Sequence, residues 1–270
     1  MASPRSIVDL IGMNGGDFPH EVSALLQDNG WIPQLAPHYV DISTGKTREI
    51  DVIGRKKVET KDSFWGSRGE FLIRLFIECK TLESDYLLHF ATRNHDKAMD
   101  FVKDNLILRQ DGEMNLERSH YLTDSEVVKT WDPAGRDDFY DAWTQSVHSM
   151  IFFSENQHEG PYVIDVPIVV FRSFDHLYRR DGSKQGYSLV TEPFQVEVDY
   201  TYPVRGRNTA KTFFVDFVAF DNLKTFLDTS IGQDISLLSE TLASQLGRDA
   251  FERMQDQQRY RDDSDPFSSY

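Results

Sequence analysis

The feature that most constrains the fold of this chain is a largely apolar run, Phe71 to Ile77, which ends in the charged tripeptide Glu78-Cys79-Lys80. A short apolar run followed by polar residues predicts a buried strand. Side chains alternate between the two faces of a strand, so Glu78 and Lys80 share one face and Cys79 points to the other. The sequence therefore predicts that a carboxylate and an ammonium group meet at the end of a strand.

A second strand is predicted upstream, over Thr47 to Ile53, where Asp51 is followed by two β-branched residues. The turn signal Ser43 to Lys46 separates it from an irregular edge strand over residues 32–42, which contains two prolines. If the strands that carry Asp51 and Glu78 are neighbours, their two carboxylates can bind one cation.

A helix is predicted before these strands. Asp17 is a preferred N-cap residue, Pro19 suits the first turn, and Glu21 follows close behind. Apolar residues at helical spacing come next, and Asn29-Gly30 predicts the end of the helix.

The order of helix glutamate, Gly30-Trp31, aspartate strand and Glu78-x-Lys80 strand resembles the PD-(D/E)XK nuclease superfamily, whose fold is shared by many restriction endonucleases. The resemblance implies an α/β fold: a mixed central β-sheet flanked by helices, in a restriction endonuclease-like core with insertions. Ile50 stands where the family name has proline. The 26 residues between Asp51 and Glu78 make a longer connection than this pattern leads us to expect.

The resemblance also implies roles for the site residues. Asp51 and Glu78 are the expected ligands of Mg²⁺, for which Mn²⁺ can substitute, and the main-chain carbonyl of Cys79 is the expected third ligand. Lys80 is expected to orient or deprotonate the attacking water, with a pKa lowered by the neighbouring cations. Glu21 is expected to bind a second ion or a metal-bound water.

Each of these residues also has an ordinary structural interpretation. Glu21 can stabilise the helix macrodipole, Asp51 or Glu49 can pair with Arg48 or Lys46, and Glu78 with Lys80 can be a common ion pair. Gln145, on a predicted helix, is a candidate for supporting the site or simply a solvated side chain.

The formal net charge of −15, from 29 basic and 44 acidic residues, argues against a protein that coats nucleic acid by bulk electrostatics. A nuclease of this composition needs a local basic surface, metal ions or a partner subunit. Residues 54–70 hold five basic residues around Phe64-Trp65-Gly66. This segment is either a nucleic-acid-binding loop near the metal site or a solvated hairpin tip.

One large domain is predicted over residues 1–247, with an insertion at about 104–135, followed by a polar tail over 248–270 that is expected to be disordered. The single cysteine excludes an intramolecular disulfide and a cysteine-rich zinc site. No apolar run reaches the roughly 18 residues needed to span a bilayer, so we expect a cytoplasmic protein without a membrane partner.

The remaining regular elements follow from periodicity. The predicted elements are a helix over Asp137 to Phe153, a buried strand over Val163 to Phe171, strands over Ser188 to Tyr202 and Thr212 to Phe220, and helical segments over Asn222 to Leu227 and Ile235 to Leu246.

The expected function is that of a Mg²⁺-dependent nuclease that hydrolyses phosphodiester bonds in DNA rather than RNA, in restriction, defence or repair. A homodimer would suit double-strand cleavage. The alternative is a non-catalytic or partner-activated subunit of a nuclease complex, which binds a protein partner through its acidic surface.

Overall fold

The computed structural model describes residues 17–105, 116–135, 137–156, 162–181, 186–204 and 207–264. Within them, ten strands form one mixed sheet, and two short strands form a separate hairpin. The large sheet contains, in spatial order, β1 (Ile32–Leu35), β4 (Val52–Lys61), β5 (Arg68–Lys80), β8 (Val163–Phe171), β12 (Arg207–Ala219), β11 (Phe194–Val204), β7 (Glu126–Pro133), β6 (Tyr86–Thr92), β9 (Leu177–Asp181) and β10 (Gly186–Leu189). The hairpin pairs β2 (His38–Val40) with β3 (Thr47–Glu49).

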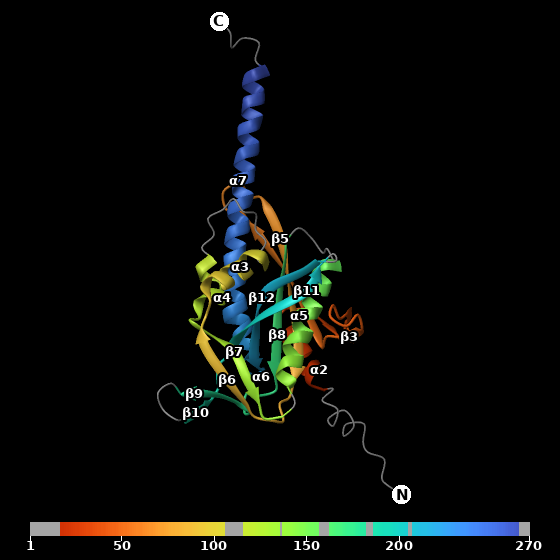
Figure 1. The fold of residues 1–270 in the computed structure, drawn as a ribbon. Helices are drawn as coiled ribbons and strands as arrows, with labels where there is room; N and C mark the ends of the chain where they lie inside the picture. The colour runs from red at the N-terminus through yellow and green to blue at the C-terminus, as the bar shows by residue number, and fades with distance from the viewer. Residues whose placement is uncertain are drawn as a thin grey trace.

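Helices cover both faces of the sheet (Figure 1). One face is covered by α5 (Asp138–Asn156), which packs on β5, β8 and β12. The other face carries α2 (Asp17–Asp28), α3 (His95–Asn105), α4 (His120–Thr123), α6 (Phe220–Phe226) and α7 (Gly232–Ser264), with the 3₁₀ turn η1 (Leu116–Arg118) and the π-helical turn η2 (Leu227–Ile231). The predicted α/β fold with a mixed central sheet flanked by helices is confirmed at this level.

The centre of the sheet is the parallel arrangement of β5, β8 and β12. The predicted strand Val163 to Phe171 coincides with β8, and six consecutive residues at its end are buried. On the neighbouring strand β12, Phe217 stacks against the ring of Phe139 from α5, with a centroid separation of 4.4 Å. A strand that is buried on both faces needs apolar side chains on both, which explains its nearly continuous apolar sequence.

The first helix agrees with prediction, whereas the predicted edge strand over residues 32–42 is divided into β1, at the edge of the large sheet, and β2, in the separate hairpin. α2 begins at Asp17, the first described residue, and Gly30 follows it with φ +77°. In that left-handed region glycine has no Cβ penalty, so it is suited to end the helix. β1 lies at the edge of the sheet and β4 lies between β1 and β5.

The prediction of one continuous strand over Thr47 to Ile53 is wrong. The structure divides it into β3 and β4, and Asp51 lies at the junction, just before β4. At this junction the carbonyl of Asp51 accepts a hydrogen bond from the Ala36 amide at 2.9 Å. The chain leaves the β2–β3 hairpin here and enters the large sheet, so Asp51 lies at a strand start.

The predicted single strand over Ser188 to Tyr202 is divided into β10 and β11, which are not neighbours in the sheet. The predicted insertion and the predicted tail also differ from the structure. Within the predicted insertion, residues 126–133 form β7, which lies inside the sheet between β11 and β6, while residues 106–115 lie outside the described residues. In the predicted disordered tail, residues 248–264 continue helix α7, and 265–270 lie outside the described residues. None of the described helices is long and apolar enough to cross a bilayer.

Candidate functional site

Asp51, Glu78 and Lys80 come together where β4 begins and β5 ends. The antiparallel register pairs Val52 with Ile77, so the residues on either side of this pair are adjacent. One Asp51 carboxylate oxygen accepts a hydrogen bond from the Cys79 amide at 2.8 Å. Lys80 Nζ lies 2.7 Å from Glu78 Oε1, as expected for side chains on the same face of a strand.

Glu78 is 3% exposed, and its second oxygen, Oε2, is buried without a hydrogen-bond partner among the described residues. Burial raises the pKa of Glu78 to about 8, and the negative charge of Asp51 contributes in the same direction, against the opposing effect of Lys80. A buried carboxylate oxygen without a donor is unfavourable in its charged form unless a cation binds it. This oxygen is therefore the strongest indication of a cation at the site.

The pKa of Asp51 is also raised, chiefly by burial, although the Cys79 amide and Lys80 oppose that shift. Two neighbouring carboxylates thus share one ammonium group. A divalent cation would offset the remaining negative charge, and Mg²⁺ is commonly held by one or two carboxylates while it keeps several waters.

In the arrangement of these side chains alone the pKa of Lys80 is raised, whereas the expected lowering depends on a bound metal. Burial does lower it, but the attraction of Glu78, followed by Asp51 and Asp141, outweighs burial and the pKa is raised. Lys80 therefore remains an ammonium group, which can attract a phosphate and orient a water molecule but is poorly suited to remove a proton.

Cys79 is free and buried, and burial raises the pKa of its thiol well above the usual value. Its side chain is thus a small apolar group on the opposite face from Lys80, as predicted. Only its main chain takes part in the candidate site, by donating to Asp51.

Glu21 does not join the two carboxylates. Its carboxylate oxygens lie 2.9 Å and 2.5 Å from the two terminal nitrogens of Arg172, and this ion pair lowers the pKa of Glu21. Arg172 lies over the ring of Phe18 on α2, at 4.0 Å, on the face of the sheet opposite to α5. Glu78 and Lys80 face α5, so the backbone of β5 separates Glu21 from them.

The basic segment 54–70 lies away from the site, contrary to the interpretation that places it near the metal. Most of it belongs to β4 and β5, which pair without a break from Val52 with Ile77 to Lys61 with Arg68. At about 3.3 Å per residue, this ladder places the Phe64-Trp65 tip roughly 30 Å from Asp51. Trp65 contacts Phe251 on α7 instead, with a centroid separation of 6.4 Å.

Sequence reasoning missed a group of buried polar residues beside the site. Tyr39 on β2 is 1% exposed, its hydroxyl has no hydrogen-bond partner among the described residues, and its pKa is raised by burial and then by Glu78 and Asp41. Asp41 is held by Arg48 at 2.7 Å and lies 3.4 Å from His148 on α5. The only signal in the sequence was the turn after Asp41, which predicted a turn and not a buried network.

Helix α5 is joined to β5 by a hydrogen bond from Ser146 Oγ to the Phe76 carbonyl at 2.8 Å. Gln145, the candidate supporting residue, donates to the Asp141 carbonyl of its own helix at 3.2 Å. The structure therefore gives Gln145 a local role, whereas Asp141 is the α5 residue whose charge reaches Lys80.

The residues present fit a divalent cation held by two carboxylates. Glu78 Oε2 and the Asp51 carboxylate are the available oxygen ligands, and the main-chain carbonyl of Cys79 is the predicted third. Among the described residues no group of three or more His, Cys, Asp or Glu side chains is placed to hold a metal, so any ion here would depend on waters or substrate for its other ligands. Comparison with protein-family models, curated proteins and solved structures found no match for this chain.

Proposed function

We propose that this chain is a Mg²⁺-dependent nuclease with a restriction endonuclease-like core, which hydrolyses phosphodiester bonds in DNA rather than RNA. The observation that carries the proposal is the convergence of Asp51, Glu78 and Lys80 at one end of two paired strands, with one glutamate oxygen buried and unpaired. The chain order supports it: α2 comes first, then Asp51 just before β4, then Glu78 and Lys80 at the end of β5, and later α5, which packs on β5 and β8.

In this proposal Asp51 and Glu78 hold the cation through their carboxylate oxygens. The bound cation would polarise the phosphodiester and supply a water or hydroxide nucleophile. Lys80 keeps its proton and is 26% exposed, so its ammonium group can contact both a phosphate oxygen and the attacking water. Asp141 favours the charged form of Lys80, and the Cys79 amide holds the Asp51 carboxylate in position.

The test is cleavage of plasmid and single-stranded DNA, with a single-stranded RNA in parallel, in Mg²⁺, Mn²⁺ or EDTA. Wild type should cut DNA only with metal, and Asp51→Asn and Lys80→Met should each lower the rate at least about a hundredfold. Lys57→Met is the matched control, because Lys57 pairs with Glu70 on the same two strands, far from the site, and is exposed. If Lys57→Met also lost activity, the losses in Asp51→Asn and Lys80→Met would be explained by disturbance of β4 and β5 and not by removal of catalytic groups.

Binding and chemistry can be separated by titrating the metal calorimetrically. Glu78→Gln should abolish the binding of Mn²⁺ measured with wild type, while Lys80→Met should retain it. Metal binding without cleavage of any nucleic acid would refute the nuclease activity of the isolated chain and leave a metal-binding subunit.

A partner-activated subunit is the second candidate, and an exposed apolar patch favours it. Phe64 is 81% exposed, and Trp65, Phe251 and Met254 lie nearby with 37–44% of their surface exposed. Exposed aromatic and methionine side chains are common in protein interfaces. If the purified chain cleaved DNA only after a second protein from the cells that produce it was added, the chain would be shown to be a partner-activated subunit.

A further inference from the structure

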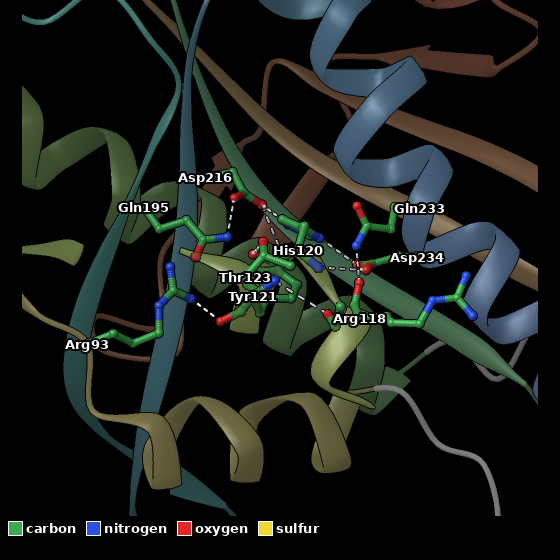
Figure 2. Close-up of polar contacts among 10 residues, drawn as sticks. Arg93, Arg118, His120, Tyr121, Thr123, Gln195, Asp216, Gln233 and Asp234 are labelled. Carbon is green, nitrogen blue, oxygen red and sulfur yellow. Dashed lines mark hydrogen bonds and ion pairs between the residues drawn. The ribbon is translucent and has the colours of Figure 1, made fainter. Parts of the chain in front are cut away.

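A second buried polar cluster is drawn in Figure 2, and the strand register places it on the face of the sheet opposite to Glu78. His120 of α4 stands between two carboxylates: its Nδ1 is 2.6 Å from Asp234 of α7, and its Nε2 is 3.2 Å from Asp216 of β12. All three side chains are at most 6% exposed. Burial alone would lower the pKa of His120, but Asp234 and Asp216 raise it to about 10, so the imidazole carries a proton.

Asp216 is the centre of this cluster. Besides His120, it accepts hydrogen bonds from the Tyr121 hydroxyl at 3.2 Å and from Gln195 Nε2 at 2.7 Å. Arg93 lies close by and donates to the Tyr121 carbonyl. With Asp124 added, the carboxylates of Asp124, Asp216 and Asp234 face the two cations His120 and Arg93, an excess of one negative charge. Glu197 also acts on Arg93 but is paired with Lys129.

A cavity of about 130 Å³ opens beside the cluster, between α4, β11, β12 and η2. Its polar wall is formed by His120, Thr123, Asp124, Gln195, Asp216, by Thr229 and Ser230 of η2, and by Gln233 of α7. Gln195 is 4% exposed, and its Oε1 has no hydrogen-bond partner among the described residues. A π-helical turn is rare and is frequently found at functional sites.

This cavity is separate from the candidate nuclease site. Asp216 pairs with Ile168 and Phe217 with Val169, and Val169 in turn pairs with Glu78. Residues paired across a sheet share a face, so Glu78 lies on the face of Phe217 and Asp216 on the other. None of the wall residues belongs to the Asp51–Glu78–Lys80 site.

We infer that this cavity binds a small cationic group, a guanidinium or ammonium carried on a small molecule. The wall offers mainly acceptors, because several of its donors are already used. His120 and one Gln195 hydrogen serve the buried carboxylates, and Thr229 Oγ1 and Gln233 Nε2 donate to main-chain carbonyls. The unpaired Gln195 Oε1, the hydroxyls of η2 and the carboxylate of Asp124 suit a ligand that donates hydrogen bonds and carries positive charge. The volume is below the roughly 300 Å³ of typical small-molecule pockets, which excludes a nucleotide.

The experiment is a titration of the isotope-labelled full-length chain, followed by its backbone amide NMR shifts at constant ionic strength. Methylguanidinium and ethylammonium are the cationic probes, and urea and acetate are the neutral and anionic probes of similar size. The two cations should give saturable shifts at Thr123, Gln195 and Thr229, with dissociation constants on the order of 1 mM. Urea and acetate should give none.

Two variants distinguish the cavity from general attraction to an acidic surface. Asp124→Asn removes an exposed carboxylate from the wall and should weaken binding of both cations about fivefold. Asp228→Asn is the matched control, because Asp228 lies on η2 outside the wall and pairs with Lys224, and it should leave affinity unchanged. The inference is overturned by the absence of saturable shifts with either cation, by binding of acetate or urea instead, or by equal effects of the two variants.

Discussion

At the scale of single residues, Glu78 and Glu21 show how burial separates side chains that look equivalent in the sequence. Glu78 is enclosed, has one oxygen without a donor and has a raised pKa. Glu21 is 43% exposed, is paired with Arg172 and has a lowered pKa. Under the proposed function only the first would bind a cation, so the two acids are expected to respond differently to substitution.

Glu21→Gln should change metal affinity and cleavage by no more than about twofold and stability by less than about 1 kcal/mol, because the exposed pair with Arg172 is worth little. Calorimetric metal titration and urea unfolding measure both, with Glu78→Gln as the comparison. If Glu21→Gln lost as much metal affinity as Glu78→Gln, Glu21 would be shown to contribute to the metal site.

His120 should make stability depend on pH. Its pKa in the folded protein is raised from an ordinary 6.5 to about 10, so its stabilising contribution is complete below about pH 6.5 and is lost as the pH rises through about 10. The free energy of unfolding from urea titrations should therefore fall across this window. The groups that face His120 are Asp216, Asp234 and Tyr121.

His120→Gln should lower stability at neutral pH, because Asp216 and Asp234 lose their shared cation, and should flatten the pH dependence between about 6.5 and 10. If the free energy of unfolding of this variant still fell with pH as in wild type, groups other than His120 would be responsible for the pH dependence.

At the scale of elements, the junction of β5 and β8 is held by a buried ion pair. Arg74 is 1% exposed, and its Nε and Nη2 lie 2.7 Å and 2.8 Å from the two oxygens of Asp165, the residue opposite it in the parallel register. The pair with Asp165 explains how Arg74 is tolerated within the largely apolar part of β5 that precedes Glu78.

Asp165→Leu should destabilise the protein by about 3–5 kcal/mol, because it leaves the buried Arg74 charge without its main partner. The double variant Arg74→Met/Asp165→Leu should recover most of the loss, since an apolar pair of similar volume removes both charges. Urea unfolding measures both proteins. Equal losses in the single and double variants would show that packing, rather than the unpaired charge, causes the effect.

At the scale of the whole molecule, helix α7 has two parts. Its first part contributes Asp234 to the His120 cluster and buries Leu237, Leu238 and Leu242. The 33-residue helix is about 50 Å long, and its last turns extend away from the sheet (Figure 1). Residues 251–256 are all exposed.

A chain that ends at Gly247 should therefore lose less than about 1 kcal/mol, with a melting temperature lower by only a few degrees. A chain that ends at Ile231 should lose several kcal/mol, because three core leucines and Asp234 are removed. Thermal unfolding measures both. A large loss on ending at Gly247 would show that the outer turns stabilise the body through contacts such as that of Phe251 with Trp65.

Much of the local structure could be predicted from the sequence. The helix start at Asp17, the strand Val163 to Phe171 and the shared face of Glu78 and Lys80 all follow from capping preference, apolar runs and alternation of side chains. The continuation of α7 through 248–264 could not, because its polar composition resembles that of a disordered segment.

The sequence by itself determined that Glu78 and Lys80 lie at the end of a strand and share one of its faces, since both features depend on the geometry of a few neighbouring residues. It did not determine that Asp51 lies at the start of β4, because the break between β3 and β4 comes from the separate hairpin. Only the tertiary structure decided that Glu21 lies across β5 from Glu78, that the basic hairpin tip is far from Asp51, and that His120 meets Asp216 and Asp234, residues 96 and 114 positions away. Those outcomes depend on strand register and on which helix covers which face. Packing between distant segments sets both, and no local pattern encodes them.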